Sequence, residues 1–293
     1  MRTVIGYHRL RGLVPYRVGV RLQEQLVQRR IADPSVPNVL LMLEHSPVYT
    51  GGRRLKGDAF VIEAARIKLD YVTYILLNLL VATETGLELF ETARGGQTTF
   101  HGPQQLVGYP VVDLRTIETR LPSATANNPN KNAHSISVRA FVGSVEDALI
   151  VACGRLGVNT KKTKDTGVWV TDDRKVAALG IQVSRYITSH GFALNCDVDL
   201  KYYDAIVPCG LSDKQATSLT RELELLLLKP TQETGQPKSN QVKVRVTAED
   251  AIPAVCFGLE QVFNVQMIQL SSVDERLASE IDNFVEQNKP TTE

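Results

Sequence analysis

The residue with the greatest chemical potential is Cys209, in the segment IVPCGL. A Pro-Cys-Gly turn after an apolar strand would expose the sulfur to backbone N–H groups. A thiol is nucleophilic only as a thiolate, so Cys209 needs a partner that lowers its pKa from about 8.5. The best candidate is Lys175, in the segment DRKVAALG, and a Cys209–Lys175 pair would form acyl thioesters. Considered alone, each residue has another interpretation. Cys209 can be an inert thiol, and Lys175 can be an ordinary surface lysine.

A second candidate segment is RGGQTTFHGP, which runs from Arg94 to Pro103. Paired glycines let the backbone approach a ligand closely, and Arg94 could orient an anionic or carbonyl oxygen. The alternative is a hairpin with a cation at its base. His190, in TSHGFALN, could act as a base, as a hydrogen-bonding strap or only as a capped turn.

Small residues follow Lys175 along its strand, at Ala177, Ala178 and Gly180. They indicate that something packs closely on this strand, and we interpret it as an acyl chain.

The composition is that of an ordinary globular protein, with 43% hydrophobic and 22% charged residues among 293. A net charge of +1 gives no electrostatic case for nucleic acid or a membrane. The four cysteines form no CxxC pair, so no metal site is expected. We interpret Cys153, Cys196 and Cys256 as core thiols, which fits a reducing compartment. The longest apolar run, residues 71–82, is shorter than the ~20 residues of a membrane span.

The first thirty residues are rich in arginine and contain a single acidic residue, Glu24. Such a start is typical of an organelle transit peptide. It is also typical of the solvated face of a first helix, and both interpretations hold if import needs little or no cleavage.

Hydrophobic periodicity predicts an α+β fold with a mixed sheet flanked by helices. We expect one domain over residues 1–293, with a core of about 4–263 and a frayed tail at 282–293. Thr247 and Asp250 form a capping-box pattern that should start the last helix, toward Phe263. The expected strands are 3–10, 39–45, 48–54, 87–93, 106–114, 168–170, 176–184, 190–196 and 206–208, and the expected helices are 16–30, 138–156, 222–228 and 247–263.

Three segments interrupt this pattern. Residues 117–136 and 231–241 are polar and are expected to be surface insertions. Residues 58–86 are long and unusually apolar, and their structure is not predicted.

Several motifs together resemble the lipoyl(octanoyl) transferases, acyltransferases of the biotin and lipoate protein ligase fold. These motifs are HSPVYT, RGGQTTFHGP, QLVGYPVVDL, TGVWV, KVAALGI, VSRYITSHGFALN and IVPCG, and they occur in family order from about Val4 to Phe263. The insertions are similar to those of eukaryotic, particularly fungal, members. The usual HGPGQ reads HGPQQ here, so that Gln104 replaces a glycine, which matters only if that position needs a positive φ.

The resemblance implies transfer of octanoyl from octanoyl-acyl carrier protein to a lysine of a lipoyl domain, through a thioester on Cys209 that Lys175 activates. The implied acceptors are the lipoyl domains of 2-oxoacid dehydrogenase acyltransferase subunits and the glycine cleavage H protein. No cofactor is implied, and the location would be mitochondrial, or cytoplasmic in a bacterium. The implied substrate-binding residues are Arg94, Gly95, Gly96, Gln97, Thr98, Thr99, Phe100 and His101 in one loop, and Ala178, Leu179, Gly180, Gly191, Phe192 and Ala193 on two strands.

Three alternatives remain open at this point. An ATP-dependent lipoate-protein ligase of the same fold would not need Cys209, and an ATP requirement separates it from a transferase. A cysteine hydrolase would pair Cys209 with His101 or His190, but the sequence offers no clear orienting carboxylate. A non-catalytic protein that binds lipoyl domains or carrier protein would bind without turnover.

Overall fold

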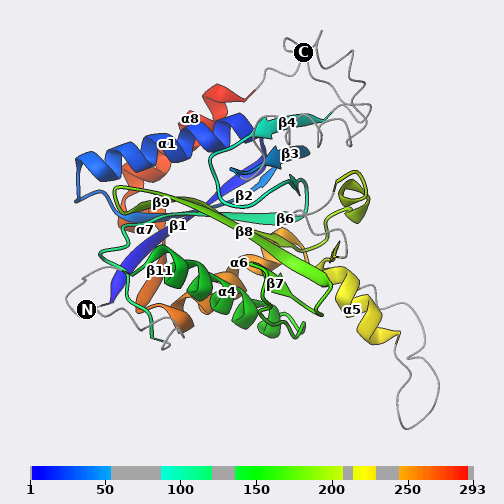
Figure 1. The fold of residues 1–293 in the computed structure, drawn as a ribbon. Helices are drawn as coiled ribbons and strands as arrows, with labels where there is room; N and C mark the ends of the chain where they lie inside the picture. The colour runs from blue at the N-terminus through cyan, green and yellow to red at the C-terminus, as the bar shows by residue number, and fades with distance from the viewer. Residues whose placement is uncertain (1, 54–86, 121–135, 207–213, 229–243, 290–293) are drawn as a thin grey trace.

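The computed structural model describes residues 2–53, 87–120, 136–206, 214–228 and 244–289. In these residues a mixed β-sheet lies between two layers of helices, and a smaller sheet flanks it (Figure 1). The strands are β1 (Thr3–Val14), β2 (Asn38–His45), β3 (Val48–Gly51), β4 (Glu88–Glu91), β5 (Thr99–His101), β6 (Gln105–Val111), β7 (Val168–Trp169), β8 (Arg174–Ser184), β9 (Ile187–Asn195), β10 (Gln215–Ala216) and β11 (Val265–Gln269). The helices are α1 (Tyr16–Ala32), α4 (Val138–Arg155), α5 (Leu219–Leu227), α6 (Ala248–Val262), α7 (Leu270–Val273) and α8 (Glu275–Asn288), with a 3-10 helix, η1 (Leu200–Tyr203).

The large sheet has the strand order β10-β8-β9-β6-β2-β1-β11, and β7 pairs with β8. Strands β8, β9, β6 and β2 pair antiparallel, whereas β1 runs parallel to β2 and β11, and β10 runs parallel to β8. In the β8–β9 hairpin, Gly180 lies opposite Gly191 and Ala178 lies opposite Ala193. The two segments expected to line an acyl site are therefore neighbours in the sheet.

Strand β2 shows why the sheet lies between two cores. Its side chains alternate between the faces of the sheet. Val39, Leu41 and Leu43 join one buried cluster, and Leu40 and Met42 join the other. Burial on both faces explains the unbroken apolar run VLLML in a central strand.

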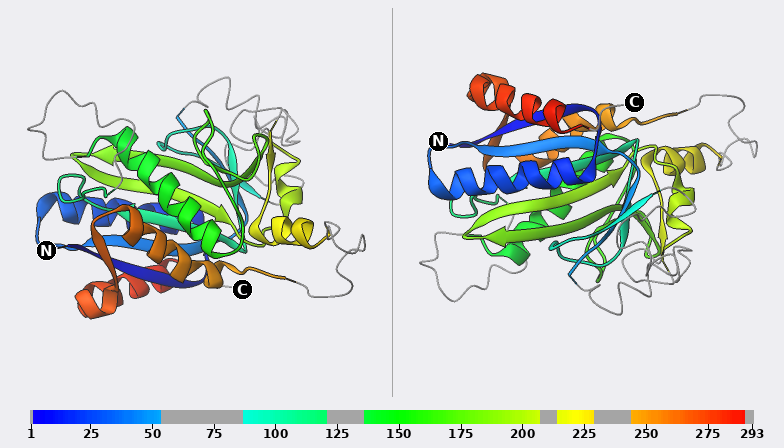
Figure 2. Two further views of the ribbon diagram at one scale, coloured as in Figure 1. Left: turned by 90° about the horizontal axis from the view of Figure 1, so that it is seen from below. Right: turned by 90° about the horizontal axis from the view of Figure 1, so that it is seen from above.

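Each core is closed by a pair of helices. Helices α1 and α8 cover one face of the sheet, and α4 and α6 cover the other (Figures 1 and 2). Helix α6 begins at the predicted capping box, in which the Asp250 N–H donates to Thr247 Oγ1 at 3.1 Å and the Thr247 N–H donates to the Asp250 carboxylate at 2.9 Å. Two N–H groups at this helix start are thereby satisfied.

The small sheet, in the order β4-β3-β5, positions the glycine-rich loop. Tyr49 of β3 and Phe100 of β5 pack with Tyr203 of η1 in a third hydrophobic cluster. The Tyr49 hydroxyl also donates to the Tyr202 carbonyl at 2.8 Å. These contacts anchor β5, and the preceding residues 94–98 approach the surface of β8.

The α+β class with a mixed sheet is confirmed. The predicted strand at 39–45 and helix at 138–156 are found within two residues as β2 and α4. The segments 58–86 and 231–241 lie outside the described residues, as do residues 121–135 of the segment 117–136 and residues 207–208 of the segment 206–208.

Two expectations about the C-terminal part are wrong. Helix α6 is not the last helix, because β11, α7 and α8 follow it. Residues 282–288 were expected to be frayed, but they form the end of α8, and Val285 is only 3% exposed. The reason is an apolar stripe at helical spacing, Leu277, Ile281 and Val285, which packs in the same core as α1.

The arginine-rich start is part of the folded core. Strand β1 and helix α1 bury Leu10, Val14 and Leu22, while Arg17 and Arg21 lie on the outer side of α1. The solvated helix face therefore accounts for these two arginines.

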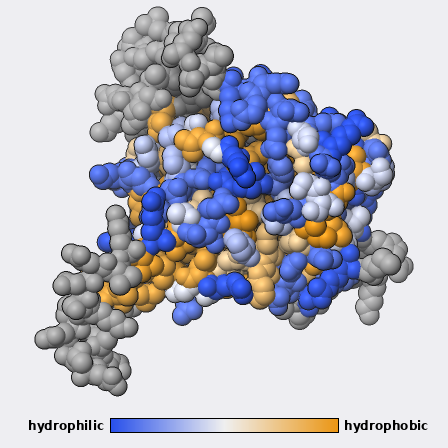
Figure 3. All heavy atoms as spheres, turned by 180° about the vertical axis from the view of Figure 1, so that it is seen from behind, coloured by the Kyte–Doolittle hydropathy of each residue, from blue (hydrophilic) through white to orange (hydrophobic). Residues whose placement is uncertain are grey.

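The surface is largely hydrophilic on the face shown in Figure 3, with smaller groups of hydrophobic residues. Leu226 and Leu228, at the end of α5, are 48% and 65% exposed. Among the described residues, no helix combines the length and the hydropathy that a membrane crossing requires.

Candidate active site

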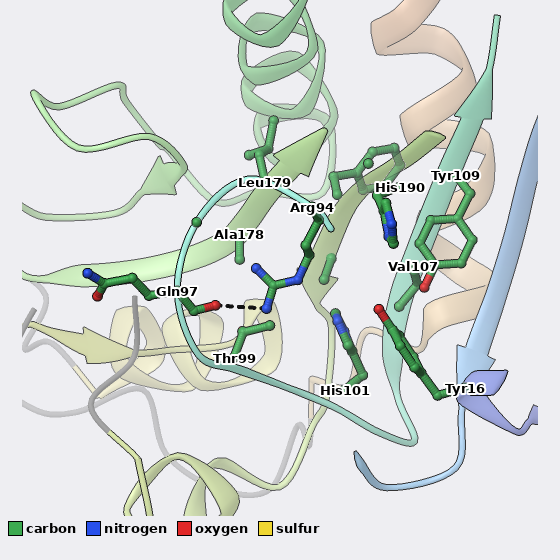
Figure 4. A pocket seen from close by; sticks show the side chains of 15 residues that line it. Tyr16, Arg94, Gln97, Thr99, His101, Val107, Tyr109, Ala178, Leu179 and His190 are labelled. Carbon is green, nitrogen blue, oxygen red and sulfur yellow. Dashed lines mark hydrogen bonds between the residues drawn. The ribbon is translucent and has the colours of Figure 1, made fainter. Parts of the chain in front are cut away.

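A narrow cavity of about 40 Å³ lies between the glycine-rich loop and the surface of strands β6, β8 and β9 (Figure 4). Its walls come from five separate parts of the chain. The lining residues are Tyr16, Arg94, Gly96, Gln97, Thr99, His101, Val107, Tyr109, Ala178, Leu179, Gly180, His190, Gly191, Phe192 and Ala193. Most of the expected substrate-binding residues therefore meet at one place.

Arg94 holds the loop in position over the sheet. Its Nη2 donates to the carbonyl and the hydroxyl of Thr50 and to the carbonyl of Gln97, each at 2.8 Å, and its Nη1 donates to the Gly95 carbonyl at 3.1 Å (Figure 4). The Arg94 side chain is 8% exposed. These four bonds fix the curvature of the loop, and a contact of Arg94 with a substrate oxygen stays a prediction.

Gly180 is small because the loop packs on it. A Cβ atom at Gly180 would lie 2.6 Å from the Gly95 carbonyl oxygen, which real contacts exclude. Ala178 lines the cavity, and the packing of an acyl chain against it stays a prediction. At Gly180 the small residue also admits protein backbone, which the sequence pattern could not distinguish from a ligand.

Two histidines, His101 and His190, and two tyrosines, Tyr16 and Tyr109, line one end of the cavity (Figure 4), and the His45 ring packs against Tyr16 and His101. The Tyr16 ring lies 5.0 Å from His45 and 5.9 Å from His101, between ring centroids. The Tyr109 ring lies 5.8 Å from His45 and 6.3 Å from His190. The Tyr109 hydroxyl donates to His45 Nε2 at 2.7 Å, because His45 Nδ1 must donate to a backbone carbonyl, that of Val14.

Burial keeps these histidines neutral. It lowers the pKa of His45 and of His190 to about 4, and it lowers the pKa of His101 well below 6.5 with a further contribution from nearby positive charge. Burial also raises the pKa of Tyr16 to about 12. Apart from the Arg94 guanidinium, the lining residues are therefore uncharged, which suits an uncharged acyl chain. Histidines with such low pKa values are weak bases, which weighs against the hydrolase alternative.

His101 begins a chain of buried hydrogen bonds. Its Nδ1 donates to Gln105 Oε1 at 2.7 Å, and Gln105 Nε2 donates to Asn195 Oδ1 at 2.8 Å. Asn195 Nδ2 then donates to the Thr217 carbonyl at 2.9 Å, and the Thr217 hydroxyl donates to Glu222 at 2.7 Å. This chain ties β5, β6 and β9 to the start of α5, so it rigidifies the walls of the cavity.

Lys175 lies in an adjoining cavity of about 20 Å³. Its Nζ donates to the Thr166 carbonyl at 3.1 Å and lies 4.5 Å from the centre of the Trp169 ring. Thr99 and Ala178 line both cavities. A chain in the first cavity can therefore present its end to Lys175 at this junction.

The remaining predicted site residues fall into two groups. Gly95 contacts β8 from the loop, whereas Thr98 and Phe100 are buried behind it, with Phe100 in the third hydrophobic cluster. Cys209 lies outside the described residues. The three other cysteines have pKa values raised by burial, to about 12 for Cys153 and Cys256.

Sequence reasoning missed several lining residues, namely Tyr16, Val107 and Tyr109, and it left the role of His190 open. The local sequence gives no sign of a role in a cavity. At Tyr16 it predicts only the start of a helix, and at Tyr109 it predicts only a strand. Among the described residues there is no group of three or more His, Cys, Asp or Glu side chains arranged to hold a metal ion.

The chain is similar in sequence to several known proteins. Residues 15–233 match the family model of the lipoyl protein ligase A/B catalytic domain. An octanoyltransferase of Koribacter versatilis is 36% identical over 274 residues, covering 92% of this chain and 89% of the relative. A mitochondrial octanoyl-[acyl-carrier-protein]:protein N-octanoyltransferase of Danio rerio is 38% identical over 214 residues, covering 73% of this chain and 80% of the relative.

Solved structures share the fold at low sequence identity. A lipoate-protein ligase A bound with ATP superposes with a TM-score of 0.55 at 11% identity, covering 100% of this chain and 97% of that one. The bipartite lipoate protein ligase of Thermoplasma acidophilum gives 0.54 at 13% identity, covering 100% of this chain and 95% of that one. The predicted lipoate and biotin protein ligase fold is thus confirmed.

Proposed function

Because the chain belongs to the lipoyl protein ligase A/B catalytic domain family and is an octanoyltransferase, we propose that its reaction passes through an octanoyl thioester on Cys209. The activity is that of an acyltransferase, which moves octanoyl from octanoyl-acyl carrier protein to a protein amino group in the first step of lipoylation.

In the first step the Cys209 thiolate attacks the carbonyl carbon of the octanoyl thioester. A new carbon–sulfur bond forms, and the bond to the carrier's phosphopantetheine sulfur breaks. The departing sulfur takes a proton from the Lys175 ammonium, so that the carrier leaves as a thiol and Lys175 is left neutral. Lys175 promotes the attack as an ammonium that favours the thiolate or as a neutral amine that takes the thiol proton. Thioester exchange changes the free energy little, so positioning and donors to the carbonyl oxygen are the main requirements.

In the second step the acceptor lysine attacks the acyl-enzyme. Its ammonium first loses a proton, for which neutral Lys175 is the base. An amide bond forms, the Cys209–octanoyl bond breaks, and the thiolate is restored. The thioester supplies the activation, so we expect no requirement for ATP or a metal.

One observation carries the proposal. Apart from the Arg94 guanidinium, the residues that line the cavity between the loop and the sheet are uncharged, and the cavity meets the Lys175 cavity at Thr99 and Ala178. Burying an octanoyl chain there contributes about 0.8 kcal/mol per CH₂ group. The thioester carbonyl would then lie at the junction beside Lys175. The buried thiols of Cys153 and Cys196 are unsuited to attack, because burial disfavours their thiolates.

Intact-protein mass spectrometry tests the intermediate. The protein is incubated with octanoyl-acyl carrier protein, and we expect one octanoyl adduct on the wild type and none on Cys209→Ser. Cys256→Ser is the matched control, because Cys256 is the least buried of the described cysteines, and it should keep the adduct. An adduct that persists on Cys209→Ser would remove Cys209 from the mechanism.

The second half of the same experiment adds an apo lipoyl domain, with and without ATP. We expect transfer in both conditions. Transfer that depends on ATP would favour the ligase alternative, and binding of the lipoyl domain without any transfer would favour the non-catalytic one.

We also propose the acceptors and the location. The acceptors are lipoyl domains of 2-oxoacid dehydrogenase acyltransferase subunits and the glycine cleavage H protein, on the basis of the family resemblance. A mitochondrial location is supported by the arginine-rich start and by mitochondrial relatives, including one in Arabidopsis thaliana, whereas other relatives are bacterial. Fractionation of cells that express a tagged full chain tests it, and a cytosolic signal in a eukaryotic cell would contradict it.

A further inference from the structure

We propose that Tyr16 and His190 form a wall that limits the length of the acyl chain this protein accepts. The inference rests on the proposed function, because it takes the cavity beneath the glycine-rich loop as the acyl site. It assigns selectivity to two residues that lie at the end of the cavity remote from Lys175.

The cavity has two differently built ends. At one end it shares Thr99 and Ala178 with the Lys175 cavity. At the other it shares Tyr16 and His190 with a groove of about 660 Å³ between α1, β4 and the tip of the β8–β9 hairpin. Within the parts of the chain that the structure describes, these two residues alone line both spaces. Beyond them there is room for a longer chain, so the wall decides where the acyl site stops.

The groove beyond the wall is polar at its margins. Arg17, Arg21, Glu24 and Glu91 lie along it, and its apolar lining is confined to a few side chains such as Phe90. Each further CH₂ group that found an apolar site would still favour binding. A simple open slot would therefore select for longer chains, and only an obstruction can favour octanoyl.

The wall is held from two sides. The Tyr16 ring stacks on His101 and lies 5.3 Å from the Phe90 ring centre. The backbone N–H of His190 donates to Oε1 of Gln23 at 2.6 Å, and Gln23 is buried in α1. Helix α1 thus fixes both residues, one in its first turn and one through a hydrogen bond.

His190 adopts a backbone conformation that favours glycine. Its φ is +56°, which costs a residue with a Cβ atom free energy, and such strain is kept where the surroundings impose it. The His190 side chain lines the end of the cavity, and this position explains why a histidine rather than a glycine stands here (Figure 4).

The polar atoms of the wall oppose a longer chain. Within the described residues, His190 Nδ1 is buried without a hydrogen-bond partner, and the buried Tyr16 hydroxyl lies close to the side chains of Arg94 and Thr92. An alkyl chain that passed between these two polar atoms would offer a hydrogen bond to neither. The methyl end of octanoyl can instead stop against the ring surfaces.

The test compares octanoyl and dodecanoyl carrier protein as donors for the full-length protein, with transfer to a lipoyl domain as the readout. His190→Gly opens the wall and suits the positive φ, so it should fold. We expect the ratio of kcat/KM for dodecanoyl over octanoyl to rise at least about ten-fold, the lower end of what a pocket gains from one methylene. His190→Asn, which also tolerates this backbone, should raise the ratio less and decides the question if the glycine variant fails to fold.

Arg185→Gly is the matched control. Arg185 lies at the tip of the same hairpin with a φ of +47° and is exposed, so glycine there relieves the same kind of strain away from the cavity. We expect its ratio to equal that of the wild type. An unchanged ratio in the His190 variants, with normal octanoyl transfer, would contradict the proposal that this wall limits chain length. An equal rise of the ratio in Arg185→Gly would contradict it as well, and neither result would contradict the proposed function. A wild type without octanoyl transfer would overturn the proposed function and the wall with it.

Discussion

At the scale of one residue, the immediate neighbours of Lys175 hold its side chain in a largely buried position. Its Nζ donates to a backbone carbonyl and faces the Trp169 ring, and the side chain is only 8% exposed. Gly167 leaves space for its stem, since a Cβ atom there would lie 3.0 Å from Lys175 Cε. The segment TGVWV thus forms a cradle for this lysine, which explains why its tryptophan and glycine accompany Lys175 in the resemblance.

Lys175→Arg should separate charge from base at this position. Arginine keeps the positive charge and the contact with Trp169, but its guanidinium stays protonated. If Lys175 is the general base, we expect transfer to fall by about 10²–10⁴-fold in kcat. Steady-state transfer assays provide the measurement, with Lys201→Arg on the surface as a control that should keep wild-type rates. Near-normal transfer by Lys175→Arg would mean that charge alone suffices.

At the scale of elements, the turn between β5 and β6 is held by one unusual residue. Gln104 has a φ of +62°, so the position that is glycine in the family pattern does require a left-handed backbone. Its carbonyl accepts from the N–H groups of Cys196 and Asp197, and its own N–H donates to Glu44 at 2.7 Å. Its side-chain oxygen accepts from Ala248 N, at the start of α6. The turn therefore joins β2, β9 and α6. The hydrogen bond of the Gln104 side chain offsets part of the free-energy cost of its strained backbone.

A pair of substitutions isolates the backbone cost at this turn. Gln104→Ala and Gln104→Gly both remove the contact with Ala248, but only glycine is at ease at this φ. We expect the glycine variant to have a free energy of unfolding about 1 kcal/mol higher than the alanine variant. Urea unfolding followed by circular dichroism measures this difference. Equal stabilities would show that the turn changes conformation when the side chain is removed.

At the scale of the whole molecule, the neutral histidines couple stability to pH. The pKa of His45 and of His190 is about 4 in the folded protein, against about 6.5 in an unfolded chain. Between these values the unfolded chain binds more protons than the folded one. These two groups therefore contribute full stability above pH 6.5, and that contribution is lost as the pH falls toward 4.

The expected effect is a decrease of up to about 1.4 kcal/mol in the free energy of unfolding per pH unit for each of these histidines, between pH 6 and pH 4.5. Urea titrations at pH 7.5, 6.0 and 5.0 measure it. His190→Gly should show a smaller pH dependence by about one proton, because one of the two groups is gone. A free energy of unfolding that does not change from pH 7.5 to 5.0 would contradict the neutral, buried state of both.

Much of the site was predictable where its residues lie in contiguous motifs. The loop from Arg94 to His101 and the strands around Ala178 and Phe192 come together as the resemblance implies, apart from Thr98 and Phe100, which lie behind the cavity. The end of the cavity was not predictable in this way. Tyr16 and His190 are 174 positions apart, and only the packing of α1 on β9 brings them to one wall.

The amino-acid sequence by itself determined the fold class, the family and the identity of the candidate chemical groups. Periodicity and short motifs involve residues that are close together in the sequence, so they can be recognised without a structure. The tertiary structure decided which side chains share a cavity, that Gly180 admits a loop, and that three histidines are neutral. These properties depend on distances and burial between segments far apart in the chain, and proximity of that kind exists only after the sheet and its helices have packed.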